Sequence, residues 1–297
     1  SAALHAQVFH LDPNIIRREY LSAEQFMDCC GQVWSTDKRS TRAVSRRAPL
    51  HGSIVYAKRD HTGALFPVLG KSRAKVVLVT AESDKEVAPD EAIPPQVGAW
   101  FSTNTNNPRV HPLPLGLGNS YCKVTVKAPE LAEVHGSPKT GLLYVNFRVT
   151  SNEADRRPVW NSYEEGERQG WVTRHPGDVG GLDYARELAR HEFVMCPPGN
   201  GTDTHRLWEA LYAGSVPVVQ RNPKLEFFED LPILFVERLE GLSREFLRER
   251  ARRMSGRTDW NWSKRFVPWS RERFERARVA LGARVPWSVF LRSKAAL

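Results

Sequence analysis

The side chains best suited to chemistry lie in residues 193–219, FVMCPPGNGTDTHRLWEALYAGSVPVV. The turn Gly199-Asn200-Gly201 can adopt backbone angles that are closed to other residues, and it lets another molecule approach the chain closely. The residues that follow are helix-capping types, so we expect a helix to begin among Thr202, Asp203 and Thr204. A glycine-rich turn that leads into a helix N-terminus favours anions, because free N–H groups and the helix dipole both attract negative charge.

Two charged residues extend this anion site. Arg206 stands in the first turn of the helix, where its guanidinium can offer a forked pair of donors to a phosphate. Glu209 follows three residues later on nearly the same side, where a carboxylate can accept the two hydroxyls of a ribose. Together these groups indicate a nucleotide diphosphate site. The structural alternative is an N-capped helix with an internal Arg206–Glu209 pair, which contributes only about 0.2–0.5 kcal/mol.

The elements around this stretch predict an α/β protein. Apolar runs at 193–195 and 216–219 read as strands on either side of the helix, and Gly214 fits its C-cap. Further strands are expected at 53–57, 76–80, 110–115, 141–149, 171–174 and 233–236, and helices at 23–34, 65–69, 183–190 and 242–253, with 97–101 open between helix and strand. Alternating strands and helices are typical of doubly wound sheets.

The chain is long enough for two domains. Residues 123–140 are mostly polar and contain Pro129, Gly136 and Pro138, so they are our best candidate for a linker. We therefore expect one domain over residues 1–135 and a second over residues 136–297. The second ends in a Trp-rich helical tail, which is expected to be buried against the first domain rather than to bind a partner or membrane.

The segment CPPGNGTDTHRLWEALYAGSVPVV resembles the signature of exostosin-like glycosyltransferases and their bacterial and viral relatives. Its ending, LWEALYAGSVPVV, is also similar to the LFDAL-x-x-GTVPVV segment of the α1,3-fucosyltransferases. Both families have two Rossmann-like domains facing each other across a cleft, the GT-B architecture, and use nucleotide sugars. The resemblance is specific over residues 193–219. It implies that Arg206 contacts the diphosphate and Glu209 the ribose.

The resemblance is looser in the first half of the chain. LVTAESD, AWFSTN and HPLPLGLGNS look like the spaced pattern LITHNSD, W-F-x-x-N and P-I-G-I-A-N of the same group. This chain departs from it at Ala81-Glu82, where the pattern has His-Asn, which puts a role for Glu82 in doubt. The resemblance implies an N-terminal acceptor-side domain and a C-terminal nucleotide-sugar-binding domain. Ser83 and Asn119 are assigned to the acceptor side.

The donor side gains further residues. Families of this architecture often carry a basic residue after the first strand of the second domain, directed at the phosphates, so Arg148 is expected to be the second cation. Its alternative is an ordinary surface arginine at a strand end. Asp203 is expected to cap the loop and His205 to line the donor pocket. The full donor-binding set is Arg148, Gly199, Asn200, Gly201, Thr202, Asp203, Thr204, His205, Arg206 and Glu209.

The expected chemistry needs charge stabilisation and a base. With no DxD motif, we expect no metal and no cofactor, and the arginines and the helix N-terminus would stabilise negative charge on the leaving diphosphate. For an inverting reaction a carboxylate or histidine takes the acceptor proton. Candidates are Asp84, Glu82 and His61, with Asp84 first because it follows the buried strand VVLVT at 76–80. An ordinary turn aspartate is an equally good reading of Asp84.

Composition limits the function classes. A hydrophobic fraction of 41% with nine Trp excludes a disordered chain. No window approaches the ~20 apolar residues that span a bilayer. Cys29-Cys30 is neither a redox nor a zinc spacing, which favours a reducing, cytoplasmic location. The net charge of +9 favours anionic partners: a glycan acceptor, or an acidic membrane met peripherally. No nucleic-acid-binding module is recognisable.

The sequence therefore predicts a metal-independent, inverting glycosyltransferase that acts on a glycan, with a surface polysaccharide as the expected acceptor. A GDP-fucose-type transferase is the alternative enzyme; HRLWEAL at 205–211 against the fucosyltransferases' EKLFDAL argues mildly against it. A non-catalytic nucleotide- or glycan-binding protein is the alternative of another class. Retained nucleotide binding without turnover would distinguish it.

Overall fold

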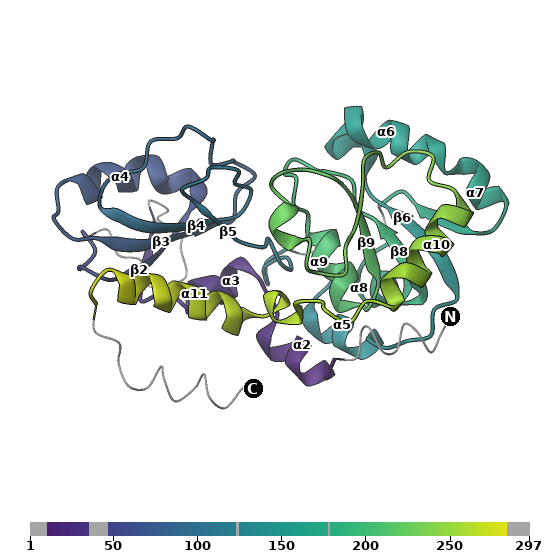
Figure 1. The fold of residues 1–297 in the computed structure, drawn as a ribbon. Helices are drawn as coiled ribbons and strands as arrows, with labels where there is room; N and C mark the ends of the chain where they lie inside the picture. Colours follow the sequence, from purple (N-terminus) through teal and green to yellow (C-terminus); the bar gives the residue numbers. More distant parts are fainter. Residues whose placement is uncertain (1–10, 36–46, 123–124, 178, 284–297) are drawn as a thin grey trace. The chain divides into compact units, whose positions relative to one another are not determined.

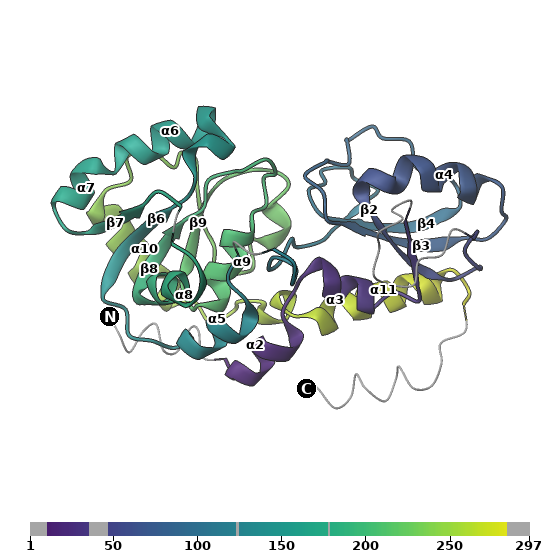
Figure 2. The same ribbon diagram turned by 180° about the vertical axis from the view of Figure 1, so that it is seen from behind.

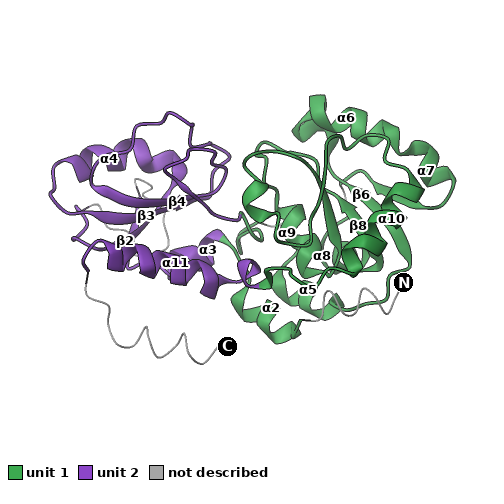
Figure 3. Cartoon of the chain, viewed as in Figure 1, with its two compact units in different colours: residues 1–22, 115–262 green, residues 23–114, 263–297 purple. Residues whose placement is uncertain are grey.

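The computed structural model describes residues 11–35, 47–122, 125–177 and 179–283. The chain is an α/β protein with two five-stranded sheets, and the strand pairs in both sheets are parallel (Figure 1), so the prediction of an α/β protein with two such sheets is confirmed. It divides into two compact units (Figure 3). Unit 1 comprises residues 1–22 and 115–262, and unit 2 comprises residues 23–114 and 263–297.

Unit 1 is built on a sheet with the strand order β10-β9-β8-β6-β7; Figure 2 labels β6, β7, β8 and β9 of this sheet. The chain runs from β6 outward to β7 at one edge and then returns to β8 on the other side of β6, so the order reverses between β6 and β8. In open α/β sheets such a reversal is a topological switch point. The strands are β6 (Gly141–Asn146), β7 (Val172–His175), β8 (His191–Met195), β9 (Val216–Gln220) and β10 (Leu234–Val236).

Helices cover both faces of the unit 1 sheet. Alternate strand residues point to opposite faces, and one set, including Leu143 and Phe193, packs with α6 (Glu153–Ser162) and α10 (Arg244–Ser255) in a single hydrophobic core. On the other face Tyr144 meets Tyr184 of α8. The helices there and at the periphery are α2 (Pro13–Glu19), α5 (Ala128–Val134), α7 (Glu164–Arg168), α8 (Gly181–Arg190), α9 (His205–Tyr212) and the short η2 (Val149–Ser151) and η3 (Glu226–Phe228).

Unit 2 contains a sheet whose strands lie in simple chain order, β1 (Gln32–Trp34), β2 (Ile54–Lys58), β3 (Val76–Ala81), β4 (Val97–Ser102) and β5 (His111–Pro112). One face packs against α4 (Thr62–Gly70), where Phe66 contacts Trp100 edge-on. The other face packs against α3 (Ala23–Asp28) and α11 (Val267–Ala280), where Phe101 contacts Phe274. The remaining short helices are η1 (Arg59–His61) and η4 (Trp262–Arg265).

The predicted helix over 23–34 is wrong in its second half. α3 ends at Asp28, and Gln32–Trp34 form β1 beside β2. Gly31 is a poor helix former, while Val33 and Trp34 are strand-forming types that gain from pairing with a buried neighbour. Residues 97–101, left open between helix and strand, form β4.

The predicted linker over 123–140 is wrong, because α5 occupies its centre. Pro129 stands in the first turn of α5, where a missing N–H leaves no helix hydrogen bond unmade, and Leu131 is buried. α5 packs against α2, α8 and α9, so this segment belongs to unit 1. The chain therefore passes between the units after residues 22, 114 and 262, whereas the sequence suggested a single boundary after 135.

The described part of the C-terminal tail contains the helices η4 and α11, with non-helical residues before and after them. α11 packs on β3 and α3 within unit 2, and Trp287 lies outside the described residues. Among the described helices, none has both the length and the apolar character needed to cross a bilayer.

Candidate anion-binding site

The switch point of the unit 1 sheet brings two loops together. Residues 147–152 leave the carboxyl end of β6, and residues 196–204 leave the carboxyl end of β8. Asn152 ties them, since its Nδ2 donates to the carbonyl oxygen of Gly199 at 3.1 Å. Because ligands of open α/β sheets bind beyond the strand ends at such a reversal, this edge is the expected site. The glycine turn singled out in the sequence therefore lies where the topology predicts it.

The glycine turn leads into α9 as expected. Thr204 is the N-cap residue, and its side chain makes no capping hydrogen bond. Gly199 N donates to the carbonyl oxygen of Gly201 at 3.0 Å, which closes a tight turn. A side chain at Gly199 would place its Cβ 2.9 Å from Nη2 of Arg156, so glycine allows that guanidinium to approach the loop. Asn200 is exposed and Thr202 half-buried.

Arg206 faces the inside of this site. Its Nε is buried and has no hydrogen-bond partner among the described residues. Its guanidinium carbon lies 5.9 Å from the ring centroid of Phe147, directly after β6. No ion pair between Arg206 and Glu209 occurs in the part of the chain that the structure describes, although the two charges lie close enough to interact electrostatically. Nε of Arg206 is therefore a donor available to another group, and the guanidinium also interacts with the Tyr184 hydroxyl.

Glu209 is held by α8. It is 3% exposed and accepts a hydrogen bond from Oη of Tyr184 at 3.0 Å. Burial raises the pKa of Glu209, and the charges of His205 and Arg206 oppose that shift. The carboxylate therefore lies on the α8 side of α9, beside Arg206 without pairing to it. Its expected contact with a ribose stays a prediction.

Arg156 is a site residue that the sequence analysis missed. It is 5% exposed, and it donates from Nε to the carbonyl oxygen of Pro198 and from Nη1 to that of Arg148, both at 2.8 Å. It thus bridges the two switch-point loops. Its guanidinium carbon lies 5.6 Å from the centroid of Phe147, the ring that Arg206 also faces. Burial and the nearby Arg206 lower the pKa of Arg156 to about 10.

A signal for Arg156 was present in the sequence. It stands at the start of α6, where the helix dipole favours acidic side chains over basic ones. A buried arginine at a helix N-terminus needs other groups to stabilise its charge. Here the carbonyl oxygens of two loops do so. Arg148, the predicted second cation, is exposed, and it is its main-chain carbonyl that Arg156 uses. A contact from the Arg148 side chain to a phosphate stays a prediction.

Asp203 and His205 hold a distant part of unit 1. Asp203 is 5% exposed; Oδ1 accepts from Nε1 of Trp208 and Oδ2 from the main-chain N of Leu115, both at 2.8 Å. Burial raises the pKa of Asp203 to about 7. Nδ1 of His205 lies 2.7 Å from the carbonyl oxygen of Gly116. The motif HPLPLGLGNS therefore reaches the glycine loop through its second half.

The predicted acceptor-side residues fall in different units. Asn119 belongs to unit 1, where its Nδ2 donates to Oη of Tyr121 at 3.0 Å and its carbonyl accepts from Nζ of Lys127 at 2.8 Å. Ser83 belongs to unit 2, directly after β3, and its Oγ accepts from the main-chain N of Lys85 at 3.0 Å. The structure therefore groups Asn119 with the donor-side residues of its own unit.

The candidate bases lie along the carboxyl edge of the unit 2 sheet. Glu82 follows β3 in the left-handed backbone region, with φ of 59°, and accepts from Oη of Tyr56 at 2.9 Å. A non-glycine residue held in that region marks local strain, which concentrates at functional sites. Asp84 is exposed, and Nδ1 of His61 lies 3.2 Å from Oγ of Ser35. Glu82 and His61 are thus held by separate groups.

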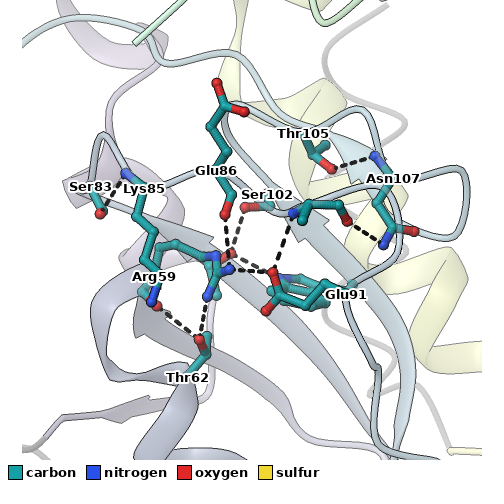
Figure 4. Close-up of polar contacts among 12 residues, drawn as sticks. Arg59, Thr62, Ser83, Lys85, Glu86, Glu91, Ser102, Thr105 and Asn107 are labelled. Carbon is teal, nitrogen blue, oxygen red and sulfur yellow. Dashed lines mark hydrogen bonds and ion pairs between the residues drawn. The ribbon is translucent and has the colours of Figure 1, made fainter. Parts of the chain in front are cut away.

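A buried arginine organises the same edge of unit 2 (Figure 4). Arg59 is 3% exposed; it forms an ion pair with Glu91 and donates to Oγ1 of Thr62 at 2.5 Å and to the carbonyl oxygen of Glu86 at 2.9 Å. Asn107 adds a bond from Nδ2 to the carbonyl oxygen of Ala88 at 2.8 Å. These contacts fasten the long loop between β3 and β4 onto the strand ends.

Comparison with known proteins adds no family. Models of known protein families give no match to this chain, and curated proteins give no similar sequence. Within the described residues there is no cluster of His, Cys, Asp and Glu that could hold a metal ion. The functional proposal therefore rests on the site itself and on the residues that carry the resemblance.

Proposed function

We propose that this protein is a glycosyltransferase of the GT-B type, which transfers a sugar from a nucleotide-diphosphate donor to a glycan hydroxyl with inversion. One observation carries the proposal. Two guanidinium groups, that of the buried Arg156 and that of the half-buried Arg206, face one aromatic ring at the switch point of unit 1, and neither forms an ion pair with a carboxylate in the described residues. Two cations beside one ring favour an anion, and a diphosphate supplies two negatively charged groups.

The donor would use the site as follows. The diphosphate binds at the glycine turn and the N-terminus of α9, where main-chain N–H groups and Arg206 meet it. Arg156 fixes the two loops that carry these groups. The rings and hydroxyl groups of Tyr144 and Tyr184 and the carboxylate of Glu209 lie on the neighbouring face of the sheet, which fits a nucleoside. The same site accommodates a released nucleoside diphosphate.

The transfer step breaks the bond between the anomeric carbon and the diphosphate oxygen. The acceptor oxygen forms the new bond to that carbon, its proton passes to a base, and the electron pair of the broken bond stays on the diphosphate. Preorganised arginines and N–H groups stabilise that growing charge. We assign the base to the group Glu82, Asp84 and His61, and the strained backbone of Glu82 favours it among them.

A nucleotide-binding screen tests the proposal. Thermal unfolding is followed with UDP, GDP, CMP, dTDP and ADP, with and without EDTA. A ligand at about 100 times its dissociation constant adds about 2.7 kcal/mol to the free energy of unfolding, a shift of several degrees. We expect one nucleotide to raise the midpoint regardless of EDTA. The shift should vanish in Arg206→Ala and persist in Arg157→Ala, whose exposed side chain pairs with Glu153.

The outcomes separate the candidate functions. No shift with any nucleotide would overturn the site. Binding without release of nucleoside diphosphate from the matching nucleotide sugar, in the presence of glycan acceptors, would favour a non-catalytic binding protein. A preference for GDP and GDP-fucose would favour the fucosyltransferase alternative. Turnover that falls at least about a hundredfold in Glu82→Gln, with nucleotide affinity kept, would identify the base, since proton transfer contributes on that order.

A further inference from the structure

The chain passes between the two units at three places, and residues next to two of these places are hydrogen-bonded to α9 or to the residue that leads into it. The chain enters unit 2 after Ser22 and returns to unit 1 at Leu115. On the unit 1 side of these passages stand Leu21 and the segment Leu115–Leu117, which we call the two crossings. Both crossings are hydrogen-bonded to α9 or to the residue that leads into it. The same helix begins at the candidate anion site.

The returning crossing is held at the start of α9. Asp203 accepts from the main-chain N of Leu115 while its other oxygen accepts from Nε1 of Trp208, so the carboxylate joins the crossing to the body of the helix. The carbonyl oxygen of Gly116 accepts from Nδ1 of His205 at 2.7 Å; a carbonyl only accepts, so Nδ1 carries the proton. Both anchoring residues adjoin the glycine turn.

The outgoing crossing is held at the other end of α9. The main-chain N of Leu21 donates to Oη of Tyr212 at 2.8 Å, and the Tyr212 side chain is fully buried. The crossings are also joined to each other, since Leu117 N donates to the carbonyl oxygen of Leu21 at 2.7 Å. Gly116 permits this approach: its φ is 72°, and a Cβ there would lie 2.2 Å from that same oxygen.

We propose that Asp203, His205 and Tyr212 are positioning residues that couple the glycine turn to both crossings through α9. An anion that orders the turn and the helix N-terminus then orders the crossings, and an ordered pair of crossings raises the affinity for the anion, because coupling between sites is reciprocal. The ligand side of this coupling rests on the proposed function. The mechanical side, from one end of α9 to the other, does not.

Amide hydrogen exchange of the ligand-free protein tests the mechanical side. In Tyr212→Phe, Leu21 loses its acceptor, and we expect its amide to exchange about tenfold faster, the effect of one lost hydrogen bond. The decisive amides are those of residues 199–206, which precede or begin α9, whereas Tyr212 is its last residue. Coupling predicts that they also exchange several-fold faster. Tyr163→Phe, which removes a buried hydroxyl bonded to the carbonyl oxygen of Leu239, is the matched control and should leave them unchanged.

Variants at the other end of α9 reverse the direction of the test. Asp203→Asn, at pH 8, should speed exchange at Leu115 and at the distant Leu21. His205→Gln keeps a donor for Gly116 and should behave as wild type, while His205→Leu should resemble Asp203→Asn. Effects confined to the residue that loses its partner would overturn the coupling and leave ordinary local structure.

A ligand arm separates this proposal from the proposed function. The probes are inorganic pyrophosphate and the nucleoside diphosphate that shifts the unfolding midpoint. We expect either probe to slow exchange at Leu21 and Leu115, and Tyr212→Phe to weaken its affinity several-fold. Probe binding that leaves both amides unchanged would overturn the coupling while the nucleotide site stands. If no nucleotide binds, the proposed function fails, and the ligand-free exchange of the variants still decides whether α9 couples its two ends.

Discussion

Buried charge is stabilised in different ways in the two units. In unit 2 Arg59 pairs with Glu91, and its Nη1 and Nη2 also donate to a hydroxyl and a carbonyl oxygen, while its buried Nε has no partner within the described residues. In unit 1 Arg156 meets two carbonyl oxygens, and Arg206 keeps a buried Nε without a partner in the described part of the chain. A pair of opposite charges is complete in itself, whereas two like charges beside one ring favour an incoming anion.

The two units also differ in the strand order of their sheets. The unit 2 sheet runs in simple order from β1 to β5, so it contains no reversal. Its carboxyl edge is covered by the loop between β3 and β4, which Arg59 and Asn107 fasten down. The unit 1 sheet reverses between β6 and β8, and the loops that leave these two strands are joined by Asn152 and Arg156. The comparison teaches that polar residues at a strand edge indicate a ligand site only when the chain leaves their charge unbalanced.

The largest expected effect concerns Asp203, whose charge is buried among neutral donors in unit 1. Its pKa is about 7 in the folded state against an ordinary 3.8. Between these values the folded protein holds more protons than the unfolded chain, so stability falls as pH rises. The slope approaches about 1.4 kcal/mol per pH unit for this one group. Above pH 7 the effect levels off.

Urea unfolding of wild type and Asp203→Asn from pH 4 to 9 measures this slope. Other groups with shifted pKa values, among them His191 and Glu209, titrate in both proteins and cancel in the difference. The wild-type free energy of unfolding should decline relative to that of the variant between pH 4 and 7. If the difference between the two proteins is flat across this range, folding does not raise the pKa of Asp203, and its carboxylate is stabilised as an anion. Buried charge would then be stabilised similarly in the two units.

The second effect concerns the balanced pair in unit 2. Arg59→Met leaves Glu91 and two oxygens without their donor, and breaking a buried pair destabilises strongly. Because the Glu91 side chain is 23% exposed to water, we expect a loss of about 2–3 kcal/mol, at the low end for such pairs. Arg109→Met is the control, since its exposed side chain reaches the same loop through the carbonyl oxygen of Glu91. Nucleotide affinity should not change in either variant; a loss in Arg59→Met would assign this arginine to a ligand instead.

Features of the site that depend on neighbouring residues could be predicted from the sequence, whereas contacts between residues far apart in the chain could not. The glycine turn and the start of α9 depend on neighbouring residue types, so their pattern was readable. The alternative of an ion pair between Arg206 and Glu209 depended on what else contacts Glu209, and its donor is Tyr184 on another helix. The strand orders depend on pairing between distant segments, and α5 was hidden by a proline that suits a first helical turn.

The smallest effect tests whether Arg156 contributes to ligand binding or only to the stability of the fold. Arg157, the next residue on the same helix, is the matched control. Arg157 is exposed and pairs with Glu153, whereas Arg156 is buried beside Arg206. In Arg156→Met we expect nucleoside diphosphate affinity to fall about tenfold, which corresponds to about 1.4 kcal/mol. In Arg157→Met affinity should stay within about twofold, since exposed pairs contribute little.

Stability decides between the two roles of Arg156. Its loss frees two loop carbonyls, which destabilises the ligand-free protein, but it also removes a like charge from beside Arg206, which stabilises it. These terms oppose each other, so the unfolding free energy without ligand should change by less than about 1 kcal/mol, as expected where function is retained at the expense of stability. Isothermal titration and urea unfolding of the same variant measure both quantities. A loss of stability with unchanged affinity would make Arg156 a structural counterpart of Arg59, and the two units would then handle their buried arginines alike.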